Sequence, residues 1–230
     1  MNEMKTAILL SGSGVFDGSE IHESVMAMLA LSQNKLEYIC TAPDINQHHV
    51  INHINGEEIN QQRNILQESA RIARGKIVSL SKLNLENISS LVIVGGFGAA
   101  KNLSDWAFKG TEGSVIEDVK NLILNFIENE KPIVSLCISP VLIAKSTEGT
   151  EFHPKLTLGS AKEKSEYNIQ ATNDAIESIG STAKNKCKSE ICVDEKLKII
   201  SAPCYMMDAD IEDIYLNVKM AINRLYQFLK

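Results

Sequence analysis

One cysteine stands where a buried strand is predicted to turn directly into a helix. Residues 133–136 form a short apolar run, Cys137 follows with no spacer, and Pro140 opens an apolar helical stretch. Proline is tolerated in the first turn of a helix because the N–H it lacks has no intrahelical partner there. This order is typical of a nucleophile elbow, in which the helix N-terminus favours thiolate over thiol. A buried core cysteine is the alternative interpretation.

Acidic side chains and glycines are predicted to approach the same corner. Glu20 and Glu23 fall in the first turns of the helix that follows the first apolar strand, and Gly95-Gly96 directly follows another. The carboxyl ends of parallel strands meet at one edge of a sheet, so we expect these loops to converge on Cys137. A carboxyl and free backbone N–H groups would then surround the sulfur.

The elements that must position these residues alternate between strand and helix. Such alternation predicts parallel βαβ units, hence a three-layer α/β/α sandwich with a mostly parallel sheet, flavodoxin-like in architecture. The expected strands cover residues 6–10, 36–41, 76–80, 91–94, 133–136, 156–158, 190–193 and 198–201; the expected helices follow Ser19 and cover 64–74, 114–130, 140–144, 174–179 and 211–229. Spacing places Ile21, Val25, Met28 and Leu29 on the buried face of the first helix.

Composition limits the classes of partner. Of 230 residues, 44% are hydrophobic, and we expect one domain over 1–230. A net charge of −6 argues against nucleic-acid or membrane partners, which favour a basic face. No apolar run approaches the roughly 20 residues of a membrane span. The first residues run straight into a predicted strand, so we expect no signal peptide. An odd count of five cysteines without a secretory signal then indicates reduced thiols in the cytoplasm.

Several strings resemble one known family nearly end to end. They are residues 11–23, 42–44, 50–53, 63–64, 68–75, 95–104, 137–140, 193–195 and 200–206, of which Gly95-Gly-Phe-Gly-Ala-Ala-Lys-Asn102 is the most specific. The chain resembles the enhancing-lycopene-biosynthesis (ElbB-like) proteins, isoprenoid-biosynthesis proteins with an amidotransferase-like domain in the DJ-1/PfpI superfamily. The resemblance implies a homodimer, an elbow cysteine with a nearby glutamate, and weak glyoxalase-type activity without a cofactor.

The implied chemistry converts methylglyoxal or glyoxal to lactate or glycolate. Cys137 would add to the aldehyde, a glutamate would move protons, and the N–H groups of Gly96 and Ile138 would hold an oxyanion. Glu20 is favoured as the glutamate because its context best matches that of the superfamily; Glu23, one turn on, is the rival. Burial raising the pKa of that carboxyl would serve both partners. Gly95 would give the backbone close access to substrate.

Other residues are secondary candidates for substrate binding or orientation. Lys101 and Asn102 adjoin the glycine loop, His22 could orient Glu20, and His53 lies in the long polar loop 44–62. The residue after Cys137 is not the histidine of the superfamily's peptidases, and no late His and Glu pair completes a glutaminase triad. Metal and nucleotide motifs are incomplete, so we expect no cofactor. The competing hypothesis is a redox-sensing or partner-binding protein in which Cys137 is oxidised.

Overall fold

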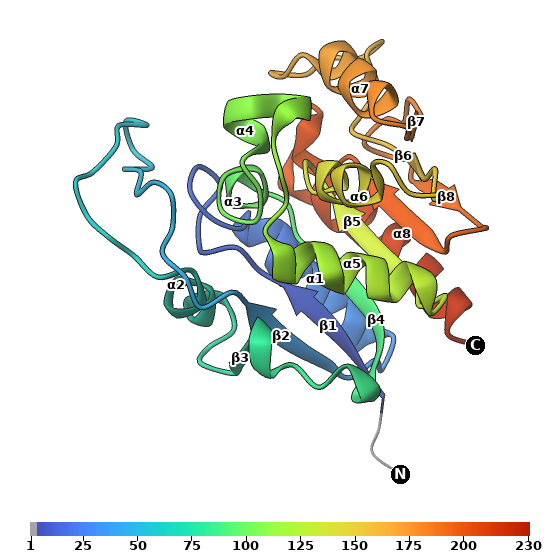
Figure 1. Cartoon of the computed structure of the whole chain (residues 1–230), viewed down its shortest axis with the longest axis horizontal. Coiled ribbons are helices and arrows are strands. Elements are labelled where there is room, and N and C mark those ends of the chain that lie inside the picture. The colour runs from blue at the N-terminus through green and yellow to red at the C-terminus, as the bar shows by residue number, and fades with distance from the viewer. Residues whose placement is uncertain (1–3) are drawn as a thin grey trace.

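The computed structural model describes residues 4–230 and is built on a seven-stranded sheet (Figure 1). The strand order is β3-β2-β1-β4-β5-β9-β8, parallel throughout except for the antiparallel pair β8 and β9. The strands are β1 (Lys5–Leu9), β2 (Tyr38–Ala42), β3 (Ile77–Ser79), β4 (Ile88–Ile93), β5 (Ile133–Leu136), β8 (Cys192–Asp194) and β9 (Ile199–Ala202). A mostly parallel α/β sheet is thereby confirmed.

Helices cover both faces of this sheet. Figure 1 shows α1 and α8 together on one face and α5 and α6 on the other, which gives three layers. The α-helices are α1 (Ile21–Gln33), α2 (Ile65–Ile72), α3 (Phe97–Lys101), α4 (Trp106–Lys109), α5 (Glu117–Glu128), α6 (Pro140–Thr147), α7 (Ile169–Ser178) and α8 (Ile211–Phe228). Short 3-10 helices are η1 (Leu80–Lys82), η2 (Leu85–Asn87), η3 (Gly110–Glu112) and η4 (Cys204–Met206). Over residues 4–230, no helix combines the length and apolar character that crossing a bilayer requires.

The three central strands are almost wholly buried, because helices cover them on both sides. Successive side chains of a strand point to opposite faces, so β1 supplies Ile8 to the core under α1 and α8, and Leu9 to the core under α5 and α6. The elbow strand β5 lies beside β4 near the middle of the sheet. Its carboxyl end therefore opens among the loops of its neighbours.

The predicted buried face of α1 is wrong for three of its four residues, and only Met28 packs against the core. Ile21, Val25 and Leu29 are 44%, 46% and 43% exposed, whereas Ala27 and Ala30 are fully buried. Helix α1 packs closely against α8 and the sheet, and small side chains permit that close approach. Leu31 is also fully buried, whereas Ile21, Val25 and Leu29 face outward.

Two other regions differ from the sequence expectation. The predicted strand 156–158 shortens to β6 (Lys155–Leu156), which pairs with β7 (Thr182–Ala183) in a sheet of its own. Helix α7 starts five residues earlier than predicted, where the Asn168 side chain accepts a hydrogen bond from the Ala171 N–H. That earlier start extends α7 beside the thiol site described below.

Candidate functional site

The elbow is formed by a backbone turn at Cys137. Strand β5 ends at Leu136, Cys137 takes the left-handed conformation with φ 57°, and α6 begins at Pro140. Its N–H donates to the Ala202 carbonyl at 2.9 Å, so the turn stays attached to β9. A non-glycine residue in this region is strained, and such strain concentrates at functional sites. The predicted elbow is present, with the side chain only 6% exposed.

Two serine hydroxyls hold the elbow in place. The Ser139 hydroxyl accepts from the Leu136 N–H at 2.9 Å and donates to the Ile93 carbonyl at 3.0 Å. Ser135 lies 2.7 Å from it, oxygen to oxygen. All three hydrogen bonds are buried and therefore strong. Through them the two small serine side chains connect the carboxyl end of β4 to the elbow after β5.

Glu23, rather than Glu20, is the carboxyl beside the thiol. The Glu23 side chain is fully buried and lies within hydrogen-bonding reach of the Cys137 thiol. Its Oε2 atom accepts from the Gly95 N–H at 3.1 Å, while Oε1 makes no hydrogen bond. The preference for Glu20 as the contacting carboxyl is therefore corrected.

Glu20 lies next to the site but performs a different task. It precedes the first turn of α1, and its Oε2 accepts from the Glu23 N–H at 2.6 Å. A side chain in this position turns back onto the helix N-terminus, whose N–H groups lack partners. Glu20 thus caps α1 and fixes the turn that presents Glu23.

The electrostatics of the pair follow from burial. Burial and the nearby charge of Glu20 raise the pKa of Glu23 from 4.5 to about 8. Burial, and then the charge of an ionised Glu23, also raise the pKa of the Cys137 thiol, opposed by the Gly96 and Ile138 N–H groups that face the sulfur. The expectation of a lowered thiol pKa is thus not met, because the lost solvation outweighs the helix N-terminus.

The glycine pair after β4 leaves no space for side chains. A Cβ on Gly95 would lie 2.4 Å from the Cys137 Cβ and 2.6 Å from the Glu23 Oε2. Gly96 has φ 93°, and a Cβ there would lie 2.4 Å from the Gly18 carbonyl oxygen. The loop after β4 thus packs directly against Cys137, as predicted.

A cavity of about 340 Å³ opens beside the thiol. Cys137 and Ile138 line it together with mostly aromatic and apolar residues from the loop after β1 and from the segments around α3, α4, α7 and η4. These further lining residues are Val15, Gly96, Phe97, Trp106, Gly110, Tyr167, Asn168, Ala171, Thr172, Ala175, Tyr205 and Met206. Sequence patterns do not identify Trp106, Tyr167 and Tyr205 as lining residues, since no spacing connects them to Cys137.

The secondary candidates His22, Lys101 and Asn102 lie in two places, one beside the cavity and two against the loop after β1. The His22 Nδ1 lies 2.8 Å from the hydroxyl of Tyr205, which lines the cavity. Asn102 is buried and donates to the Ser11 and Asp17 carbonyls, and Lys101 donates to the Phe16 carbonyl. These two side chains hold the loop after β1 and do not line the thiol cavity.

His53 and the other histidines also lie away from the sulfur. His53 Nε2 accepts from the Phe16 N–H at 3.2 Å and stacks on that ring, so it attaches the 44–62 loop to the loop after β1. None of the five histidines hydrogen-bonds to Cys137, and within residues 4–230 no three His, Cys, Asp or Glu side chains gather as metal ligands would. A Cys–His pair is therefore missing from the described site.

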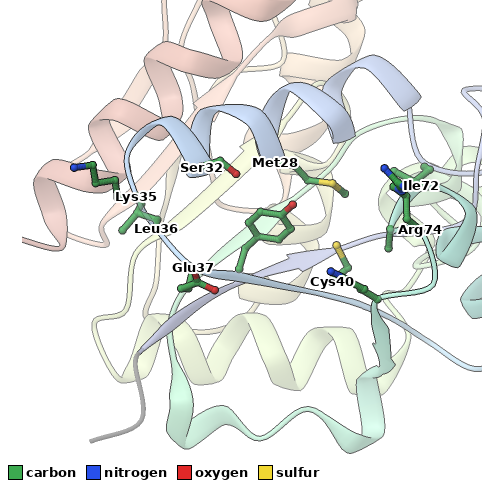
Figure 2. A pocket seen from close by; sticks show the side chains of 11 residues that line it. Met28, Ser32, Lys35, Leu36, Glu37, Cys40, Ile72 and Arg74 are labelled. Atoms are coloured by element: carbon green, nitrogen blue, oxygen red, sulfur yellow. The ribbon is translucent and has the colours of Figure 1, made fainter.

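A larger cavity lies elsewhere, and the described residues that line it form no acid–thiol pair. About 930 Å³ in volume, it lies between α1, α2 and β2; Figure 2 shows the Met28 side chain reaching down from α1 toward the Cys40 sulfur. Lys35 and Arg74 stand at opposite ends, each just after the C-terminus of a helix (Figure 2). Basic side chains there complement the negative end of the helix dipole, which would itself repel an anion.

Relatives of known sequence cover nearly the whole chain. It is 37% identical over 225 residues to the rat "ES1 protein homolog, mitochondrial", covering 97% of this chain and 83% of the relative. The human "Glutamine amidotransferase-like class 1 domain-containing protein 3, mitochondrial" matches at the same identity, with 97% and 82% covered. No protein-family model matches. Because these relatives are named as mitochondrial, the expected cytoplasmic location is contradicted; reduced cysteines do not distinguish compartments that keep thiols reduced.

Solved structures agree on the fold. The isoprenoid biosynthesis protein with amidotransferase-like domain from Ehrlichia chaffeensis superposes with a TM-score of 0.89 at 32% identity, over 99% of this chain and 100% of that one. A ThiJ/PfpI domain protein from Brachyspira murdochii shares the fold alone, with a TM-score of 0.56 at 12% identity over 99% and 98% of the two chains. The chain belongs to the family of ES1 protein homologues, the proteins with a glutamine amidotransferase-like class 1 domain.

Proposed function

We propose that this protein is a cofactor-independent, glyoxalase III-like enzyme that converts an α-oxoaldehyde to a 2-hydroxy acid. The observation that carries the proposal is the buried pair of Cys137 and Glu23 beside a cavity. A thiol nucleophile and a carboxyl with a pKa of about 8 can exchange protons near neutral pH. The strings shared with ElbB-like proteins, and the similarity to an isoprenoid biosynthesis protein, support placing the chain among ElbB-like proteins.

The chemistry balances without an external oxidant or reductant. The Cys137 sulfur bonds to the aldehyde carbon, and the thiol proton goes to its oxygen, giving a hemithioacetal. Glu23 takes the proton from that carbon, and the electron pair forms the C=C bond of an enediol while the ketone oxygen gains a proton. Glu23 then returns its proton to the former ketone carbon, and the hemithioacetal hydroxyl loses its proton as its carbon becomes the thioester carbonyl. Water then cleaves the resulting thioester, hydroxyl going to carbon and a proton back to sulfur. The N–H groups of Gly96 and Ile138 would stabilise the oxyanion of this last step.

The redox-sensing alternative fits the site less well. Sensor cysteines are accessible and have a lowered pKa, whereas Cys137 is buried and has a raised one. A buried carboxyl that holds a proton next to the sulfur serves proton transfer better than oxidation.

Lactate formation from methylglyoxal tests the proposal. We expect Cys137→Ser and Glu23→Gln to lose at least about 100-fold in kcat/KM, within the range given by general acid–base catalysis. Glu20→Gln keeps an oxygen that can cap α1, so it should lose less than about tenfold. The proposal fails if the wild-type protein makes no more lactate than Cys137→Ser.

A further inference from the structure

The residues that line the cavity beside Cys137 indicate which class of substrate it can bind. Of the residues that line it, none is Lys, Arg, Asp, Glu or His within the described chain. Binding sites for phosphate or carboxylate groups use Arg, Lys or a cluster of free N–H groups. The free N–H groups of Gly96 and Ile138 face the Cys137 sulfur, so an anionic group farther into the cavity would meet no compensating charge.

The polar side chains of the lining are mostly engaged already. Asn168 accepts from the Ala171 N–H at 3.1 Å, Thr172 donates to the Asn168 carbonyl at 3.1 Å, and the Tyr205 hydroxyl bonds to His22. These three side chains thus stabilise the protein structure around α7 and η4. What remains for a ligand is the Tyr167 hydroxyl and the apolar surface of Trp106 and neighbouring aromatic and alanine side chains.

The cavity is also large for methylglyoxal. About 340 Å³ corresponds to roughly eleven times the share of one water in the liquid, whereas methylglyoxal has five non-hydrogen atoms. Sites of this volume with an apolar lining are typical of compounds that bury a hydrophobic body. Methylglyoxal would leave most of the lining uncovered.

We infer that the physiological substrate class is an uncharged α-oxoaldehyde, or a closely related carbonyl compound, with an aromatic or branched aliphatic body. Its aldehyde carbon meets the Cys137 sulfur, and its body lies between Trp106 and the Ala171 face of α7. This inference rests on the proposed function, because it specifies the substrate of the same thiol.

The first test compares three probes: methylglyoxal, phenylglyoxal and 4-carboxyphenylglyoxal. Each kcat/KM is divided by the rate at which that aldehyde forms a hemithioacetal with a small free thiol, which removes intrinsic reactivity. We expect phenylglyoxal to exceed methylglyoxal at least tenfold, since each buried methylene contributes about fourfold. The carboxylate should cost at least tenfold. Equal values for methylglyoxal and phenylglyoxal would overturn the inference and leave the proposed function standing.

Cavity-filling variants connect this preference to the site. Ala171→Leu narrows the cavity on a helix that tolerates leucine well, and should lower the phenylglyoxal-to-methylglyoxal ratio at least fivefold. Ala107→Leu is the matched control, because Ala107 is exposed on α4 and does not line the cavity. An unchanged ratio in Ala171→Leu contradicts the inferred pose.

A labelling experiment tests the inference even if no aldehyde turns over. The alkylation rates of Cys137 by uncharged 2-bromoacetophenone and anionic iodoacetate are measured by mass spectrometry, each relative to the half-buried Cys187 of the same chain. We expect the aryl reagent to be favoured at Cys137 at least tenfold over the anion. No selectivity would overturn the inference; turnover failure combined with this selectivity would reject only the proposed function.

Discussion

The carboxyl of Glu23 lies against the thiol of Cys137, and both side chains are buried. An ionised Glu23 raises the pKa of the Cys137 thiol, whereas the Cys137 thiol lowers the pKa of Glu23, so the two ionisations are coupled. Between them they hold at least one proton near neutral pH, because the pKa of Glu23 is about 8. At neutral pH the site therefore holds a protonated group beside the sulfur and does not display a permanent thiolate.

Activity should rise with pH up to about 8. The proton on the substrate carbon must go to ionised Glu23, and below its pKa of about 8 the ionised fraction falls tenfold per pH unit. We expect kcat/KM for an α-oxoaldehyde to increase close to tenfold from pH 6 to pH 7. The measurement is a pH–rate profile corrected for the uncatalysed reaction; a flat profile over this interval would show that Glu23 is not the base.

The stability of the fold should depend on pH through the same carboxyl. Because the pKa of Glu23 is raised on folding from 4.5 to about 8, the folded state binds more protons between these values. The free energy of unfolding therefore falls as pH rises through this window, by at most about 1.4 kcal/mol per pH unit. Urea titrations should show that the free energy of unfolding of Glu23→Gln, relative to that of the wild type, increases from pH 5 to pH 8. Glu86→Gln, which changes an exposed glutamate, should follow wild type.

Gly95→Ala should damage both the fold and the site. The new Cβ would overlap the Cys137 Cβ, at 2.4 Å, and the carboxyl of Glu23. We expect a loss of about 1–3 kcal/mol in unfolding free energy, as for overpacked cores, with a loss of α-oxoaldehyde turnover. Gly56→Ala is the control, since nothing lies within 4 Å of its Cβ position and only its φ of 75° is strained. It should cost about 1 kcal/mol and leave turnover unchanged.

The exposed apolar face of α1 and α8 should be where two copies associate. Ile21, Val25 and Leu29 lie one turn apart on α1, and Leu216 is exposed on the adjacent α8. Large apolar side chains gathered on one face are typical of an interface. We expect sedimentation to give twice the chain mass of 25.3 kDa and Val25→Glu to give the monomer. Ile54→Glu, at a single exposed residue outside this face, should stay dimeric; a monomeric wild type would contradict the expectation.

The elbow was predictable because its signal is local. A buried run, a cysteine and a following proline are adjacent in sequence, and β5, Cys137 and α6 follow them residue by residue. The choice between Glu20 and Glu23 was not local. It depended on which carboxyl turned back to cap α1, and both residues lie within one helical turn.

The cavity was less predictable still. Trp106, Tyr167 and Tyr205 come from separate segments that the fold brings around Cys137, and no periodicity relates them. The exposure of Val25 had a similar cause, since helix spacing identifies an apolar face but does not say whether it meets the sheet or faces outward. Tertiary packing decided both cases.

The two outermost strands of the large sheet have one further consequence. Both β3 and β8 contain only three residues, and β8 runs antiparallel to its neighbour. A long unpaired edge is a template on which other chains can add strands, and very short edges remove that template. Edge-to-edge addition of strands from other chains is therefore disfavoured at both sides of this sheet.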